Sequence, residues 1–93
     1  MKVSLVGGMS RLEGHYIGEA AKLGIELRVF NRSRADLTAR LRSTDAVVLI
    51  TGKVSHQARI QVMAAARFSR IPVLQCRSSG IRSFKYCLDS LVR

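Results

Sequence analysis

The chain has 93 residues, a length that supports one hydrophobic core and therefore a single domain, residues 1–93. Apolar residues make up 47%, as in ordinary globular proteins, and the longest apolar runs are too short to cross a bilayer, which excludes an integral membrane protein. Sixteen Lys and Arg against six Asp and Glu give a formal net charge of +10. Such an excess favours association with anions, although it also suits a solvated basic surface that serves solubility.

The N-terminus and the cysteines indicate the compartment. Lys2 is followed by a short apolar run and then by Gly7-Gly8, without the long apolar segment and cleavage site of a signal peptide. Two cysteines, Cys76 and Cys87, do not make a disulfide framework. We therefore expect a cytoplasmic protein with reduced thiols and no association with membranes.

The first segments predict a strand followed by a helix. Lys2–Val6 is an apolar strand that ends at Gly7-Gly8, and a polar loop is expected from Met9 to Gly14. Apolar residues then recur at helical spacing from Tyr16 to Leu23. Gly24 stands where a glycine commonly ends a helix.

The middle of the chain predicts two strands with a short helix between them. Ile25–Phe30 alternates apolar and charged residues, as an edge strand does. Ser33 followed by Asp36 resembles a capping box, which predicts a short helix through Leu41. Asp45–Thr51 is the most apolar segment and is expected to be a central strand.

The last segments predict a helix, a strand and a final helix. Ser55 is a candidate N-cap for a helix whose apolar positions run from Ala58 to Ala66. Ile71–Leu74 is a short strand with Pro72 at its start. The final helix is marked by apolar residues at spacings of three and four, namely Ile81, Phe84, Leu88 and Leu91.

This alternation of strands and helices predicts the fold. Strands joined through helices pair in parallel by right-handed crossovers. The simplest doubly wound arrangement of four such strands has the order 2-1-3-4. We therefore predict an α/β domain, a flavodoxin-like or Rossmann-like three-layer sandwich with a four-stranded parallel sheet and four helices.

The predicted topology also indicates where a ligand would bind. In open α/β sheets, ligands bind beyond the carboxyl ends of the strands, where the strand order reverses. Glycines there allow close approach of the backbone, hydroxyls and helix N-terminal amides donate to anions, and arginine binds phosphate with two bonds. The same residue types are also common in loops because they form turns and caps. The candidate ligand-binding residues are Gly7, Gly8, Ser10, Arg11, Thr51, Ser55, His56, Arg77 and Ser78.

One catalytic pattern occurs at the same edge. Cys76 and Arg82 are separated by five residues, and Ser83 follows, between a strand and a helix. This Cys-x5-Arg-Ser arrangement resembles the signature of cysteine-dependent phosphatases, in which a thiolate attacks phosphorus and an arginine holds the phosphoryl group. The glycines do not match that loop, and Asp89, inside the last helix, is no suitable general acid.

Two binding alternatives use other residues. His15, His56 and Cys76 are candidate ligands for a metal or a haem if the fold gathers them, but no short ligand spacing supports this. A cluster of arginines offers contacts to a nucleic-acid backbone, although three of the few aromatics, the phenylalanines at 30, 68 and 84, are expected in the core rather than stacked on bases. The arginines of that cluster are Arg32, Arg34, Arg40 and Arg42.

Several stretches are similar to a known family over nearly the whole chain. They are Gly7-Gly8 with Arg11, the Gly24-Ile25-Glu26 step, Asp45–Thr51 followed by Val54-Ser55-His56, and Ile71-Pro72-Val73 followed by Cys76-Arg77-Ser78-Ser79. Through them the chain resembles the bacterial domain of unknown function 2325. Members usually have an acidic-aromatic pair in place of Gly52-Lys53 and often Asn in place of Ser55, and their pattern does not require an arginine at position 82. The resemblance implies a small Rossmann-like fold and no established activity.

These observations favour a binding module over an enzyme. The expected function is binding of an anionic, phosphate-bearing ligand at the carboxyl edge of the sheet. The alternatives are a nucleic-acid-binding accessory protein and, third, a cysteine-dependent phosphatase. No cofactor is indicated by the sequence, and an exposed sheet edge is compatible with a homodimer.

Overall fold

A computed structural model describes residues 1–30, 41 and 43–92. Each predicted strand is present in it. The elements in chain order are β1 (Lys2–Val6), a 3-10 helix (Ser10–Leu12), α1 (Glu13–Lys22), β2 (Glu26–Phe30), β3 (Ala46–Ile50), a second 3-10 helix (Thr51–Lys53), α3 (His56–Ser69), β4 (Val73–Cys76) and α4 (Ile81–Val92).

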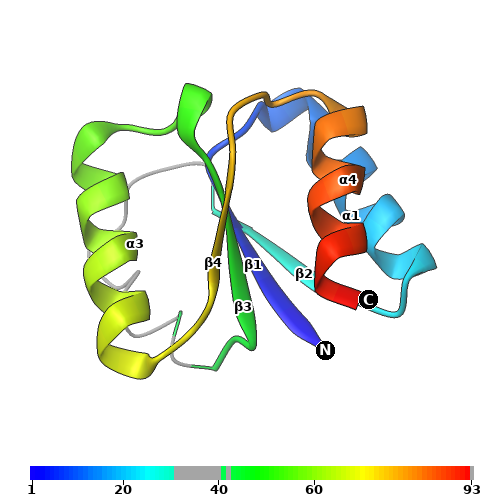
Figure 1. Ribbon diagram of the computed structural model, residues 1–93. Coiled ribbons are helices and arrows are strands. Elements are labelled where there is room, and N and C mark those ends of the chain that lie inside the picture. Colours follow the sequence, from blue (N-terminus) through cyan, green and yellow to red (C-terminus); the bar gives the residue numbers. More distant parts are fainter. Residues whose placement is uncertain (31–40, 42, 93) are drawn as a thin grey trace.

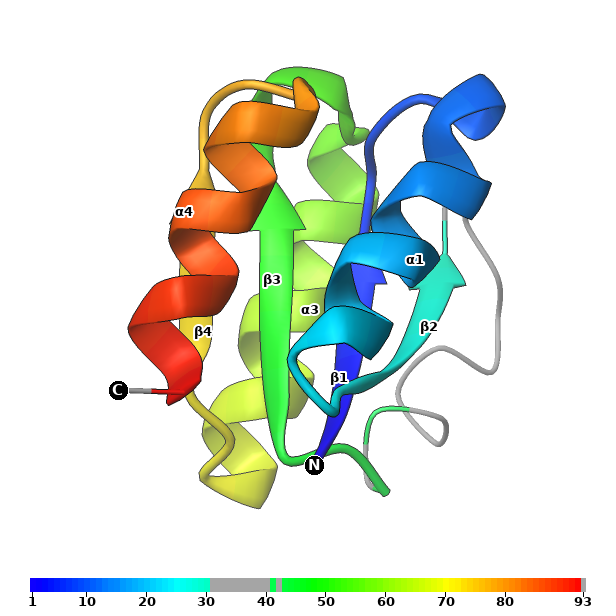
Figure 2. The same cartoon turned by 90° about the vertical axis from the view of Figure 1, so that its right-hand side faces the viewer.

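The sheet has the predicted topology. Its four strands are parallel and lie in the order β2-β1-β3-β4, so the strand order reverses between β1 and β3 (Figure 2). All five residues of β3 are buried, as expected for a central strand. β2 lies at an edge of the sheet and alternates between exposed and more buried residues.

Helices cover both faces of the sheet, which gives three layers. α1 and α4 lie side by side on one face, and α3 lies on the other (Figure 1). The side chains of β3 alternate between the two resulting cores. Val48 and Ile50 pack with Tyr16 of α1 and Phe84 of α4, whereas Leu49 packs toward α3. Glu19 of α1 also forms an ion pair with Lys85 of α4 at 3.7 Å.

Several predicted elements need correction. The described residues contain three α-helices rather than four, and the predicted helix from Ser33 to Leu41 lies outside them except for its last residue. Met9–Gly14 is not an irregular loop, because a 3-10 helix and the first turn of α1 occupy most of it. β4 begins at Val73 rather than Ile71, since the N–H of residue 71 instead donates to the Ala66 carbonyl of the α3 C-terminus.

One core prediction was wrong. Phe68 is 81% exposed, although a core position was expected. α3 turns Val62, Ala65 and Ala66 toward the sheet, and Phe68 lies outside this buried face of the helix. Among the described residues, no helix is both long and apolar enough to cross a membrane.

The helix ends follow the predicted local signals. Gly24 follows α1 with a φ of +74°, a conformation that glycine adopts without steric cost. Ser55 caps α3, since its side-chain oxygen accepts a hydrogen bond of 3.1 Å from the Ala58 N–H.

At the other end of α3, Arg70 has a φ of 57° and its N–H reaches the last carbonyls of the helix. This left-handed position usually contains glycine.

Arg70→Gly is therefore expected to stabilise the domain by about 0.5–1 kcal/mol, because the strain of a side chain at positive φ is relieved. The gain is partly offset by the greater freedom of glycine in the unfolded chain. Urea unfolding followed by circular dichroism measures the difference. Arg70→Ala keeps the strain and is the matched control. Equal stabilisation by both variants would contradict the explanation.

Candidate functional site

Three loops meet at the carboxyl edge of the sheet. Residues 7–12 follow β1, residues 51–55 follow β3, and residues 77–80 follow β4. Because the strands are parallel and each of these loops leads into a helix, the N-termini of α1, α3 and α4 lie at this same edge (Figure 2). These loops, together with Cys76, are here called the edge platform.

The two glycines after β1 turn the chain across this edge. Gly7 and Gly8 have φ values of 94° and 92°, which disfavour any other residue. The Gly7 N–H donates to the Phe30 carbonyl at the end of β2 over 2.9 Å. A Cβ on Gly8 would lie 3.1 Å from Ile50 Cδ1 and 3.2 Å from the Tyr16 hydroxyl, so the backbone approaches the core closely here. These glycines shape the platform rather than only leaving room for a ligand.

Tyr16 connects the first and third loops from beneath. Its hydroxyl donates to the Ser79 carbonyl, and the Met9 N–H lies 3.4 Å from the same oxygen. Its ring is fully buried and packs edge-on against Phe84 with centroids 4.9 Å apart. The sequence predicted Tyr16 only as part of an apolar helix face. The signal for its further role was chemical, since a buried tyrosine hydroxyl requires a hydrogen-bond partner.

The second and third loops also interlock. The Thr51 hydroxyl donates to the Cys76 carbonyl at 3.5 Å. Gly52 lies directly against the Arg77 carbonyl oxygen, so close that a Cβ at position 52 would overlap it. The three loops therefore form one connected surface. The predicted ligand-binding residues of all three are brought to one edge, although Thr51 and the glycines already have structural roles.

The serines of the platform are held in place by backbone groups. Ser55 accepts from the Ala58 N–H, and the Ser78 hydroxyl oxygen accepts from the Gly80 N–H at 3.1 Å. A hydroxyl that accepts a backbone N–H keeps its own proton for donation. Both serines are exposed. They can therefore stabilise a turn or helix end and also donate to an anion.

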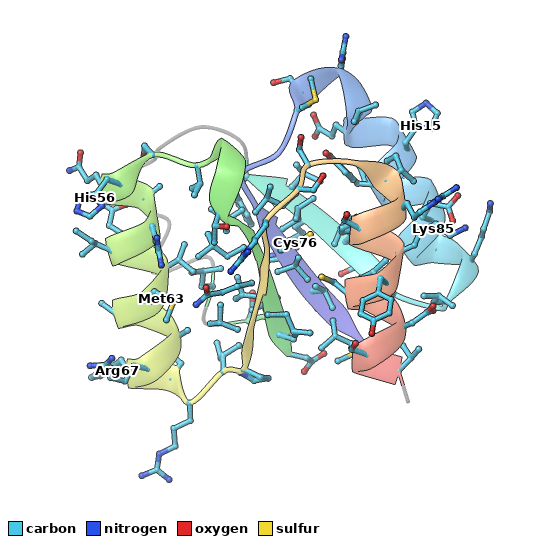
Figure 3. The ribbon with its side chains drawn as sticks, turned by 45° about the horizontal axis from the view of Figure 1, so that its top comes forward. His15, His56, Met63, Arg67, Cys76 and Lys85 are labelled. Carbon is cyan, nitrogen blue, oxygen red and sulfur yellow. The ribbon has the colours of Figure 1, made fainter. Side chains whose placement is uncertain are left out.

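The charged side chains within the edge platform are basic. Arg11 and Arg77 are exposed on the first and third loops, and His56 is the exposed first residue of α3 (Figure 3). The Arg11 guanidinium makes a long contact of 4.0 Å to the Met9 sulfur. No Asp or Glu occurs in the segments 7–12, 51–55 and 76–80. The exposed carboxylate of Glu13, the first residue of α1, directly follows the first loop, so anions at this edge meet the two arginines and a neighbouring negative charge.

The geometry around Cys76 does not suit a phosphatase. Its side chain is only 4% exposed, and its thiol donates to the Ser78 carbonyl at 3.1 Å. A phosphatase loop surrounds the bound phosphate with N–H groups, whereas a carbonyl oxygen faces the thiol here. Arg82 lines a shallow groove along α4 with Tyr86 and Asp89, rather than a cradle above the thiol.

The candidate metal ligands are separated. His15 is exposed on α1 and His56 is exposed at the start of α3, on opposite faces of the sheet, whereas Cys76 is buried between them (Figure 3). In residues 1–30, 41 and 43–92, no three His, Cys, Asp or Glu side chains are grouped as a metal ion requires. The four arginines of the nucleic-acid alternative, Arg32, Arg34, Arg40 and Arg42, lie outside the described residues.

The second cysteine of the chain lies in the α1/α4 core. Burial, together with the neighbouring Cys76 thiol, raises the pKa of the Cys87 thiol from 9.0 to about 11. The folded state thus favours the protonated thiol. The stability from this preference should be fully present below pH 9 and should be lost as the pH rises through about 11.

We therefore expect the stability difference between the wild type and Cys87→Ala to be constant from pH 7 to 9 and to shrink from pH 9 toward 11. Urea unfolding at each pH measures it. Comparing the two proteins cancels the titration of lysines, which both share. A difference that stays constant up to pH 11 would contradict a raised thiol pKa.

The fold and its edge define a class of protein, the small doubly wound α/β domain with a four-stranded parallel sheet. Within that class, the chain belongs to the family DUF2325, described as "Uncharacterized protein conserved in bacteria", whose model matches residues 2–91. The family suspected from the sequence is thus confirmed. A search of curated proteins found no match to the chain.

Proposed function

We propose that this domain is a cytoplasmic binding module for an anionic, phosphate-bearing ligand held on the edge platform. One observation carries the proposal: interlocked loops without carboxylates present exposed Arg11 at the point where the strand order reverses and exposed Arg77 one strand further along. Ligands of doubly wound sheets bind at this point. The N-termini of three helices lie at the same edge and add partial positive charge.

Each group has a role in the proposed complex. Arg11 and Arg77 neutralise the ligand and donate to its oxygens from two sides. Ser55 and Ser78 donate the hydroxyl protons that their structural hydrogen bonds leave available. His56 donates from the first turn of α3. Ser10 lies next to Arg11 in the 3-10 helix, whereas Gly7, Gly8 and Thr51 hold the loops in their positions.

Titration calorimetry with inorganic pyrophosphate at low salt tests this site. Arg11→Ala/Arg77→Ala is expected to weaken binding roughly 10- to 30-fold, because each exposed charge-assisted hydrogen bond contributes about 1 kcal/mol. Arg67→Ala/Arg70→Ala is the matched control. It removes the same charge from the far end of α3, so it should leave the affinity nearly unchanged.

The outcomes distinguish a specific anion-binding site from general electrostatic attraction. If both double variants weaken binding equally, the net charge alone attracts the anion and the platform is not a site. If neither does, the proposal fails. A native mass spectrum of freshly purified protein adds an independent observation, since a resident phosphate-bearing ligand would appear as a discrete added mass that Arg11→Ala/Arg77→Ala loses.

A further inference from the structure

The outer surface of α3 carries exposed apolar side chains. Ile60 is 55% exposed and Phe68 is 81% exposed, and the exposed Ala64 lies between them. Residues four apart lie on the same side of a helix, so these three form one stripe. The sheet is covered by the opposite side of α3 through Val62 and Ala65. The stripe therefore contributes nothing to the described core.

Basic side chains run beside this stripe. A shallow groove of about 310 Å³ on α3 is lined by Ile60, Met63 and Ala64 together with His56, Arg59 and Arg67. Figure 3 shows His56 and Arg67 extending from α3 away from the sheet. The combination of an aromatic side chain, methionine and arginine is typical of protein interfaces.

No carboxylate is available within this part of the chain to pair with Arg59 and Arg67. Between Asp45 and Asp89 the sequence contains no Asp or Glu at all. That stretch includes β3, α3, β4 and most of α4. The α3 surface therefore combines an apolar stripe with positive charge that its own helix does not neutralise.

We propose that the outer face of α3 docks an acidic amphipathic helix of a partner protein. Apolar side chains of the partner cover Ile60 and Phe68, and its carboxylates lie against Arg59 and Arg67. Charge complementarity selects this occupant. A second copy packed through α3 about a two-fold axis would place arginines opposite arginines, which is unfavourable. A nucleic-acid backbone would gain nothing from Ile60.

A synthetic peptide of this chemistry is a direct probe. We would use a fluorescein-labelled amphipathic helix with leucines on one side and glutamates on the other, and measure its fluorescence anisotropy as the protein is added. Ile60→Ser/Phe68→Ser and Arg59→Gln/Arg67→Gln are each expected to weaken binding at least 10-fold. Both pairs change exposed residues, so the variants should fold as the wild type does.

The matched control is Arg11→Ala/Arg77→Ala, which lowers the charge equally at the edge platform and should leave peptide affinity within about two-fold. A second peptide with serines in place of the leucines should bind at least 10-fold more weakly. Equal binding of the two peptides, no measurable binding, or no effect of Ile60→Ser/Phe68→Ser would overturn the proposal. The proposal would also fail if the protein bound phosphatidylglycerol vesicles or a thymidine oligonucleotide more tightly than the peptide and with the same sensitivity to the variants. That result would assign the face to another class of partner.

Discussion

Gly52→Ala is expected to lower the free energy of unfolding by about 1–3 kcal/mol, the range found when extra atoms are forced into a packed site. The added Cβ would overlap the Arg77 carbonyl oxygen. That oxygen belongs to the backbone after β4, so it cannot move like the end of a flexible side chain. The effect is purely steric, because Gly52 is not among the glycines with positive φ.

Urea unfolding measures this loss, and Gly18→Ala is the control. Gly18 lies within α1, and a Cβ there would have no neighbour within 4 Å. Alanine should instead stabilise the domain by about 0.5–1 kcal/mol, because it is the better helix former. If Gly52→Ala proves as stable as the wild type, then the second and third loops are not interlocked as described. The same variant should also weaken pyrophosphate binding, since Arg77 must shift.

Tyr16→Ala is expected to destabilise the domain more, by about 3–5 kcal/mol, because it removes a fully buried ring and leaves a cavity. The ring packs against Phe84, and its hydroxyl joins the loops at Met9 and Ser79. Tyr16→Phe separates the two contributions, since it keeps the ring and removes the hydroxyl. Its expected cost is about 1–2 kcal/mol, which reflects the partners left unpaired.

Denaturant unfolding of both variants, with amide exchange of the edge loops, tests this role. Tyr16→Phe should accelerate exchange in residues 9–12 and 78–80 while β3 stays protected. If Tyr16→Phe matches the wild type in stability and in loop exchange, the hydroxyl does not connect the loops. A loss of amide protection that spreads evenly over the sheet would likewise contradict a local connection between the loops.

The sequence predicted the fold well because its signals are local and agree with one another. The apolar run that became β3, the glycine after α1 and the capping Ser55 each indicated an element or its end. Their alternation then predicted parallel strands, and the simplest doubly wound order of four strands is the one found. Phe68 was misplaced because a phenylalanine on a helix suggests a core position, whereas its exposure depends on which side of α3 faces the sheet.

The sequence predicted where the candidate edge lies, but not the contacts that build it. The parallel topology brings the three loops to one end of the sheet, and that much follows from the order of the elements. The contact of Gly52 with the Arg77 carbonyl and the bond from Tyr16 to Ser79 join residues far apart in the sequence. Neither has a local pattern, so only the three-dimensional structure reveals how the loops are held together, and of these four residues Arg77 alone was expected to contact a ligand.

The run without carboxylates from residue 46 to 88 has a consequence for how the domain responds to acidification. Lys and Arg keep their charge throughout the physiological pH range. The positive potential over α3 and β4 therefore does not weaken as a cell compartment becomes more acidic. Any pH dependence of association at these surfaces, whether with phosphate or with glutamate side chains, would mainly originate in the molecule that binds.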